Sequence, residues 1–300
     1  MPFLARGGDS VTDSGVRRRR FRRPVVVLAA SMVIASGLTA CNAEAGPPTA
    51  ELHLVPVHGR TMAFSVTPGR LPAIVLDAGG GMDSSEWSKV APDLAARTGS
   101  EVIAYDRAGE GKSDESPGPW RADNAAADLA AGLTQLGVTK NVVLVSHSLA
   151  GEVAFSFARS HPDRVAGAVL VDANLPQFFT PSETAKLVAL NEKQVEDLKK
   201  APSTRQTRQL LAQADGYGPV HAAYHQLTWP SGIPAAVIVS AETPFPTPED
   251  AQLWRQAQQD FAHVAPNRTL VTAEHSSHDI PLDRPDVVVT AVENLLKQVR

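Results

Sequence analysis

Ser148 comes shortly after the run 142–145, which is rich in β-branched residues. The next five residues, 146–150 (SHSLA), lead into a helical pattern, so Ser148 lies at a tight turn between a strand and a helix. Such a turn presents its central side chain to a substrate, and it needs small residues two places before and after. This chain has Ser146 and Ala150 there. The pattern predicts Ser148 as a nucleophile, and the alternative is an ordinary turn in which Ser148 caps the helix.

A serine hydroxyl becomes a nucleophile only beside a base, and His278 is the candidate base. It follows the last predicted strand and precedes the C-terminal helix, so in a doubly wound sheet it reaches the same edge as Ser148. His275 and Asp279 beside it also allow a metal site. We disfavour metal binding because no second histidine cluster accompanies these residues. We expect no metal and no cofactor.

Residues 1–40 resemble an export signal, with arginines over 17–23 and an apolar stretch over 25–38 that is short for a membrane span. Residues 38–41 (LTAC) resemble a bacterial lipobox, whose cysteine becomes the lipidated first residue after cleavage. Cys41 is the only cysteine of the chain. We expect an exported domain, anchored to the outer face of the bacterial cytoplasmic membrane by lipidated Cys41. An uncleaved anchor helix is the alternative.

The composition is that of an ordinary globular protein, with 43% apolar and 20% charged residues. The whole chain has 28 Lys and Arg against 32 Asp and Glu. Loss of residues 1–40 removes seven basic and two acidic side chains, which leaves 21 against 30 and a formal charge near −9. This charge argues against nucleic acid as a partner. A small-molecule substrate is expected, and the sequence leaves the oligomeric state open.

Short apolar runs alternate with helical patterns along residues 52–300. The first two runs alternate as a half-buried hairpin, and the later ones are apolar throughout, which is typical of strands buried on both faces. The expected strands are Leu52–Val57, Arg60–Val66, Ala73–Leu76, Glu101–Tyr105, Asn141–Val145, Ala166–Val171, Ala235–Val239 and Arg268–Val271. The expected helices are Glu86–Arg97, Arg121–Leu136, Leu149–Ser160, Pro248–His263 and Pro285–Val299. This order predicts an α/β fold with a doubly wound, mostly parallel sheet.

One connection of about sixty residues breaks this alternation. It contains helix-forming stretches at Ser182–Lys200 and Thr204–Ala214 and several aromatic residues. We expect it to form a helical cap over the crevice, inserted before the penultimate core strand. The predicted organisation is a lipoprotein signal over 1–40, a linker over 41–51, and one domain over 52–300 with its cap at about 174–233.

Four further motifs, in order along the chain, accompany the serine turn. They are Ala78-Gly79-Gly80-Gly81 with Trp87 downstream, the segment 106–114 (DRAGEGKSD), the phrase 161–165 (HPDRV) and Ser276-Ser277-His278. With these motifs the chain resembles the α/β-hydrolase family over nearly all of residues 52–300. The segment 106–114 is the most specific of them, and we expect it to shape the crevice rather than to react. His147 is expected to pack or bond locally, and His221 to lie at the surface or in the cap.

The resemblance leaves two candidates for the acid that orients His278. Members of the family usually carry this acid after the strand that follows the cap, where this chain has Glu242. Some members carry it after the strand that precedes the cap, where Asp172 closes the run 169–172. We prefer Asp172 and keep Glu242 as the alternative.

The same resemblance implies an oxyanion hole of backbone N–H groups. Leu149, next after the predicted nucleophile, supplies one donor, and the spacing back from Trp87 points to Gly80 for the second. A phosphate-binding loop is the rival for these glycines, but the Lys-Ser/Thr pair of a P-loop does not follow them.

Together these residues predict a serine hydrolase that cleaves a carboxylic ester through an acyl-enzyme at the cell surface. Ser148 attacks, His278 transfers protons, and Asp172 or Glu242 orients it. Related enzymes that cleave haloalkanes or epoxides use aspartate in place of the serine. Cleavage of an amide, a thioester or a C–C bond remains open, as does a non-catalytic binding lipoprotein of the same fold.

Overall fold

The structure is a computed structural model, and it describes residues 49–300. The predicted export signal over 1–40, Cys41 and most of the predicted linker over 41–51 lie outside the described residues. Within the described part of the chain, every helix is too short or too polar to cross a membrane.

An eight-stranded sheet forms the centre of the described chain, with its strands in the order β1-β2-β4-β3-β5-β6-β7-β8. β1 and β2 form an antiparallel hairpin, β2 pairs antiparallel with β4, and the remaining pairs are parallel. The strands are β1 Glu51–Val57, β2 Arg60–Thr67, β3 Arg70–Asp77, β4 Ser100–Tyr105, β5 Val142–His147, β6 Val165–Val171, β7 Ala235–Ser240 and β8 Arg268–Ala273.

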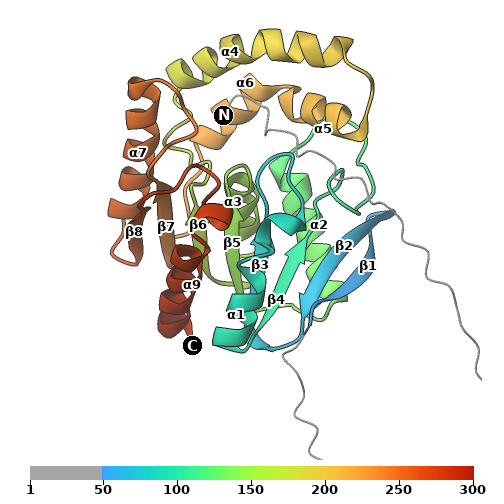
Figure 1. The fold of residues 1–300 in the computed structure, drawn as a ribbon, viewed down its shortest axis with the longest axis vertical. Helices are drawn as coiled ribbons and strands as arrows, with labels where there is room; N and C mark the ends of the chain where they lie inside the picture. The colour runs from blue at the N-terminus through green and yellow to red at the C-terminus, as the bar shows by residue number, and fades with distance from the viewer. Residues whose placement is uncertain (1–48) are drawn as a thin grey trace, which may run out of the picture. The chain divides into compact units, whose positions relative to one another are not determined.

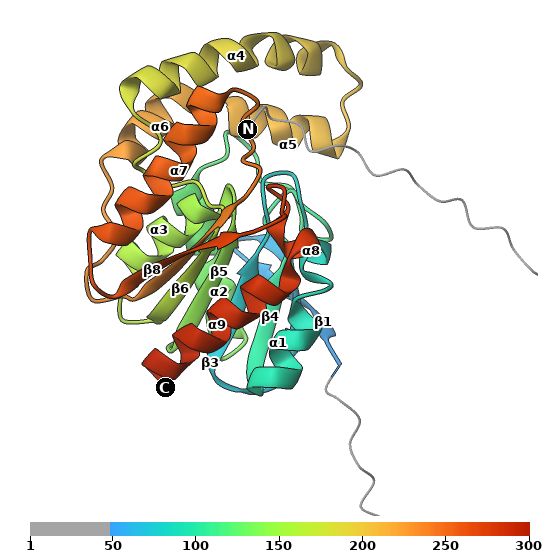
Figure 2. The ribbon, with the colours of Figure 1, turned by 60° about the vertical axis from the view of Figure 1, so that its left-hand side comes forward.

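Helices cover both faces of this sheet, as the two ribbon views show (Figure 1, Figure 2). The helices are η1 Ser84–Trp87, α1 Ala91–Thr98, α2 Ala122–Gln135, α3 Ala150–Ser160, α4 Pro181–Lys200, α5 Arg205–Ala214, α6 Tyr217–His225, α7 Pro248–His263, α8 Ile280–Asp283 and α9 Pro285–Val299. Side chains of α2, α3 and α7 pack in one hydrophobic cluster, and those of α1, α8 and α9 pack in a second.

The alternation of side chains along a strand explains why the central strands are apolar throughout. In β5, Val142 and Leu144 belong to the first cluster, whereas Val143 and Val145 belong to the second. Successive side chains of a strand point to opposite faces, so a strand covered on both sides needs apolar residues at every position. The predicted fold class, a doubly wound and mostly parallel sheet, is confirmed.

The structure corrects one expected helix and adds two short ones. The expected helix over 86–97 is divided into η1 and α1, because Pro92 lacks the N–H of a helix interior and lies instead in the first turn of α1. α6 was not expected because Gly218 and Pro219 are poor helix formers. α8 has only four residues and leaves little periodicity to detect.

The cap consists of α4, α5 and α6, which connect β6 to β7. In both views these helices lie beyond one end of the sheet, next to the loops that leave the parallel strands (Figure 1, Figure 2). Thr180 caps α4 by accepting the N–H of Glu183, and Thr204 forms a capping box with Thr207 at the start of α5. Tyr224 of α6 packs edge-on against Phe155 of α3, which fixes the cap to the core.

Candidate active site

The turn between β5 and α3 holds Ser148 in a left-handed backbone conformation, with φ of 53°. Its N–H donates to the carbonyl of Val171 at 3.1 Å, and its own carbonyl accepts the N–H of Asn174 at 2.8 Å. Ser146 and Ala150, two places on either side, are buried. A left-handed non-glycine residue is uncommon and typical of a functional site.

The space around this turn explains why it needs small residues. A Cβ built on Gly151 would lie 2.5 Å from the carbonyl oxygen of Asn174 and 2.9 Å from the Cβ of Ala173. The loop that leaves β6 therefore passes directly against the start of α3. This close approach brings the ends of β5 and β6 together at the site.

His278 lies in the loop between β8 and α8, close to Ser148. Its Nε2 is 2.9 Å from the Ser148 Oγ, and its Nδ1 is 2.6 Å from Oδ2 of Asp172. Ser276 steadies the loop by donating from its hydroxyl to the carbonyl of Ala273 at 2.8 Å. The structure thus brings Ser148, His278 and Asp172 together in one chain of contacts, although they are far apart in the sequence.

Asp172 follows β6 and is completely buried. Its Oδ1 accepts the backbone N–H of Ser240 at 3.1 Å and the indole N–H of Trp254 at 2.8 Å. Its Oδ2 accepts the hydroxyl of Ser240 at 2.6 Å in addition to the imidazole of His278. Four donors therefore converge on one carboxylate, an arrangement that suits the ionised form.

The charge states follow from this environment. Burial alone would raise the pKa of Asp172, but the hydrogen bonds from His278, Ser240 and Trp254 outweigh it, so the pKa lies below its ordinary value. Burial lowers the pKa of His278, and its attraction to Asp172 only partly opposes this. A neutral imidazole with its proton on Nδ1 donates to Asp172, and its Nε2 then accepts the hydroxyl of Ser148.

The alternative residues considered from the sequence lie elsewhere. The side chain of Glu242 is exposed, and its backbone N–H donates to the carbonyl of Ser276 at 2.9 Å. His275 is also exposed, and within residues 49–300 it belongs to no group of three side chains that could hold a metal ion. Of the two acids considered, Asp172 contacts the imidazole.

The glycine loop after β3 lies on the other side of Ser148. Gly80 and Leu149 line the same pocket as Ser148, and a Cβ built on Gly80 would lie 3.1 Å from a methyl carbon of Leu149. The glycine loop therefore packs directly against Leu149 beside Ser148. The N–H of Gly79 is already used, because it donates to Oε2 of Glu86 at 2.9 Å.

Arg107, from the motif at 106–114, holds the backbone of this loop through hydrogen bonds. It is buried and forms an ion pair with Asp77, and its guanidinium donates to the carbonyls of Ala78 and Gly79. Burial opposes its charge, but the attraction to Asp77 outweighs burial and raises the pKa of Arg107. The segment that was expected to shape the crevice thus fixes the backbone that precedes Gly80.

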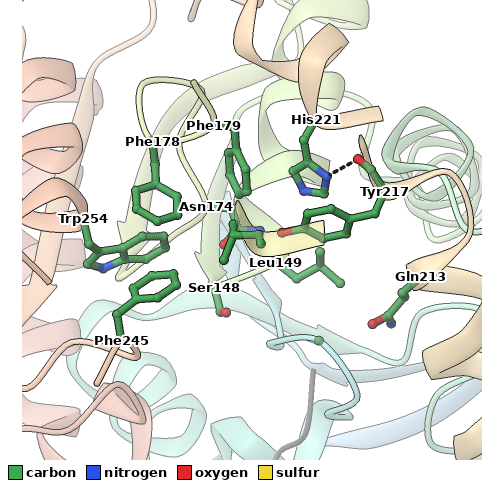
Figure 3. Close-up of a pocket in the computed structure, with 12 residues that line it drawn as sticks. Ser148, Leu149, Asn174, Phe178, Phe179, Gln213, Tyr217, His221, Phe245 and Trp254 are labelled. Carbon is green, nitrogen blue, oxygen red and sulfur yellow. Dashed lines mark hydrogen bonds between the residues drawn. The ribbon is translucent and has the colours of Figure 1, made fainter. Parts of the chain in front are cut away.

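A pocket with about 560 Å³ of space, including its mouth, opens beside Ser148. In Figure 3, Phe178, Phe245 and Trp254 form an apolar side of the pocket, and Gln213, Tyr217 and His221 form a more polar side opposite them. Phe179 and Asn174 lie between the two groups, and Leu187 also lines the pocket. Gln213 is 8% exposed, and within residues 49–300 its Nε2 has no hydrogen-bond partner. The pocket can therefore accept an apolar group and a hydrogen-bond acceptor together.

Two buried acid–histidine pairs were missed in the sequence. Glu86 lies 2.8 Å from His147, and Glu152 lies 3.2 Å from His221. The expectation that His221 is a surface or cap residue is correct for its element, α6, but its side chain is buried. The only signal for the first pair is the position of His147 directly before Ser148, and no spacing in the sequence points to Glu86 as its partner.

A model for the alpha/beta hydrolase fold matches residues 72–214. The chain is also 26% identical to a haloalkane dehalogenase of Sphingobium indicum over 84% of this chain and 97% of that enzyme. It is 38% identical to an uncharacterized protein of Mycobacterium tuberculosis, over 43% of this chain and 36% of that protein. The matched region is thus about a third of the mycobacterial relative.

The solved structures that resemble this chain share its fold. A thermophilic esterase from Thermogutta terrifontis superposes with a TM-score of 0.57, over 83% of this chain and 99% of the esterase, at 20% identity. At this identity the likeness concerns the arrangement of strands and helices. The residue at the turn after β5 of this chain is Ser148.

Proposed function

We propose that this chain, which has the α/β-hydrolase fold, cleaves carboxylic esters through an acyl-enzyme formed on Ser148. The observation that carries the proposal is the distance of 2.9 Å between Ser148 Oγ and His278 Nε2, with Asp172 on the far side of the imidazole. A base within 2.6–3.2 Å of a serine hydroxyl can remove its proton as the oxygen attacks.

The first half of the reaction transfers the acyl group. Ser148 Oγ bonds to the ester carbonyl carbon while its proton passes to His278 Nε2, and the carbonyl oxygen becomes an oxyanion. The N–H groups of Gly80 and Leu149 donate to that oxyanion, and ionised Asp172 stabilises the imidazolium. The carbonyl then re-forms, the bond to the alcohol oxygen breaks, and the proton on His278 goes to the leaving alcohol.

The second half returns the enzyme to its starting state. A water molecule gives its proton to His278 Nε2 as its oxygen bonds to the acyl carbon. The bond between that carbon and Ser148 Oγ breaks, and the proton returns to Ser148. The acid product leaves, and the net reaction is ester plus water giving acid plus alcohol.

The two-sided pocket supports a substrate with one apolar and one polar end. On the apolar side, Phe178 and Trp254 pack edge-on with their ring centroids 5.0 Å apart, and they suit a short alkyl or aromatic group. The unpaired amide N–H of Gln213 on the polar side suits a carbonyl, ether or hydroxyl oxygen, because a buried donor without a partner is costly.

A fluorophosphonate probe tests the acyl transfer without knowledge of the natural substrate, since it reacts with an activated serine. We expect the wild type to be labelled, Ser148→Ala to remain unlabelled, and short p-nitrophenyl esters to be hydrolysed only by the wild type. Absence of both labelling and hydrolysis in a folded wild-type protein would instead support a binding protein of this fold. Matched amide and thioester substrates then measure the preference for an ester.

The location at the cell surface is part of the proposal, and its support is the lipobox-like run 38–41 in the sequence. Lipidation of Cys41 would anchor the domain to the outer face of the cytoplasmic membrane. We expect Cys41→Ala to move the protein from the detergent-soluble membrane fraction to the soluble one. If the variant stays as firmly bound as the wild type, the anchor is not this cysteine.

A further inference from the structure

A second acid–histidine pair lies directly beside the proposed catalytic residues. The proposed acyl transfer does not use this second pair. Glu86 and His147 are both almost fully buried, and Oε1 of Glu86 lies 2.8 Å from Nδ1 of His147. The imidazole rings of His147 and His278 are 4.7 Å apart between their centroids. A buried acid–histidine pair this close to the proposed base is a candidate for a functional role in the site.

The hydrogen-bond partners of the pair fix where its protons lie. Nε2 of His147 is 2.9 Å from the backbone carbonyl of His278, and because a carbonyl can only accept, this nitrogen carries a proton. Oε2 of Glu86 accepts the N–H of Gly79 at 2.9 Å, so that oxygen carries none. One further proton must lie between Oε1 of Glu86 and Nδ1 of His147.

Each partner of the pair holds a different loop of the site. Glu86, in η1, holds Gly79 and so the turn that leads to Gly80. His147, at the end of β5, holds the backbone of His278 and directly precedes Ser148 in the chain. The pair therefore joins the glycine loop, the turn that bears the serine and the loop that bears the base.

The charged groups around Glu86 favour its carboxylate form. Burial alone would raise the pKa of Glu86, but His147 and, more weakly, Arg107 outweigh it, and the pKa lies below its ordinary value. Asp77 also faces Glu86; burial raises the pKa of Asp77 above its ordinary value, although the ion pair with Arg107 opposes this. The shared proton therefore lies on the histidine.

The groups around His147 favour its imidazolium form. Burial alone would lower the pKa of His147, but Glu86, the carbonyl of His278 and the charge of Asp172 outweigh it, and the pKa is raised. The imidazolium in turn opposes a second positive charge on His278. This repulsion adds to burial in lowering the pKa of His278.

We propose that Glu86 and His147 form a permanent ion pair that positions the reacting loops and keeps the imidazole of His278 neutral, ready to act as a base. The role in catalysis rests on the proposed function, whereas the charge state of the pair does not. Glu86 and His147 are positioning residues, because they reach the reacting atoms only through Gly79 and His278.

Glu86→Gln separates the charge from the contacts. The glutamine oxygen can still accept from Gly79, and its NH₂ can donate to Nδ1 of a neutral His147, whose Nε2–H still donates to His278. The variant thus keeps all three hydrogen bonds and removes both charges. Glu242→Gln serves as the matched control, because it removes an exposed carboxylate near the same loop.

Nitrogen-15 NMR of the histidine side chains reads the charge directly and does not require activity. We expect both ring nitrogens of His147 to be protonated at pH 7 in the wild type and in Glu242→Gln, and only Nε2 in Glu86→Gln. We also expect His278 to titrate about one pH unit higher in Glu86→Gln, because a nearby like charge has gone. A His147 with a single proton in the wild type, or an unchanged midpoint of His278, would overturn the proposed charge.

The pH profile of kcat/KM tests the consequence for catalysis. If the wild type hydrolyses p-nitrophenyl esters, we expect the acid limb of Glu86→Gln to move up by the same interval, with kcat on the plateau within about threefold. His147→Phe, which removes the contacts as well, should lose at least about tenfold in kcat at every pH. Equal kcat in a folded His147→Phe refutes the positioning role, and an inactive wild type refutes the ester function while the NMR result stands.

Discussion

The substitution Asp172→Asn tests whether the carboxylate determines which ring nitrogen of His278 carries the proton. Oδ1 accepts two donors that cannot reverse, the backbone N–H of Ser240 and the indole N–H of Trp254. The asparagine oxygen must therefore take the place of Oδ1, and its NH₂ must take the place of Oδ2. That NH₂ faces Nδ1 of His278 and donates to it, whereas the hydroxyl of Ser240 can rotate and accept.

The result is the wrong tautomer of the base. His278 then carries its proton on Nε2, where it can no longer accept the hydroxyl of Ser148. The loss of the corresponding acid in a serine triad costs about 10⁴-fold in kcat, which corresponds to about 5.4 kcal/mol of transition-state stabilisation at 1.36 kcal/mol for each factor of ten. We expect a loss of this size in hydrolysis of p-nitrophenyl acetate and in the rate of fluorophosphonate labelling.

Two controls separate this effect from unfolding. Asp172→Asn keeps a polar side chain of the same shape, so its cooperative thermal unfolding should remain observable and its circular dichroism spectrum unchanged. Glu242→Gln, at the competing position, should retain kcat within about twofold, as expected for an exposed side chain away from the imidazole. If Asp172→Asn stays within tenfold of the wild type, or if Glu242→Gln shows the large loss, the assignment of the acid is wrong.

Three further outcomes are expected. The pKa of His278 lies below its ordinary value of 6.5. We therefore expect kcat/KM to be constant near pH 7 and to fall only as the pH drops through a midpoint below 6.5. A midpoint above 6.5 in the kcat/KM profile contradicts the lowered pKa. Gly151→Ala should lower the free energy of unfolding in urea by about 1–3 kcal/mol, because the new Cβ meets the carbonyl of Asn174. In the control Gly232→Ala the new Cβ meets no atom within 4 Å. Its free energy of unfolding should stay within about 1 kcal/mol of the wild-type value. Gln213→Leu should raise KM by about threefold to tenfold for esters that carry an oxygen acceptor and leave KM unchanged for matched alkyl esters; equal KM changes in both series would show that this amide does not bind the acceptor.

The sequence predicts those parts of the molecule that depend on local pattern. The β-branched run before Ser148 and the small residues around it give the strand, the turn and the start of the helix together. The order of strands and helices likewise predicts the parallel sheet, and its carboxyl edge is where Ser148 and His278 meet. These features are encoded within a few neighbouring residues.

Contacts between distant segments carry no such local signal. The choice between Asp172 and Glu242 depends on which side chain is buried beside the imidazole, and both follow core strands. The partnership of Glu86 with His147 joins residues 61 positions apart, and a glutamate in a helix normally indicates an exposed face. Such pairs are recognised only when the fold shows that both side chains are buried.

The cap enters the chain between β6 and β7, whose backbones pair directly from Ala168 with Ala235 onward. The scaffold that carries the serine, the histidine and Asp172 is thus continuous beneath an insertion that supplies Gln213, Tyr217 and His221 to the pocket. The insertion thus supplies polar groups of the pocket, whereas Phe245 and Trp254 of its apolar side follow β7 and belong to the scaffold. Changes in the length or sequence of the insertion can therefore alter which polar groups the pocket accepts and leave the arrangement of Ser148, His278 and Asp172 intact.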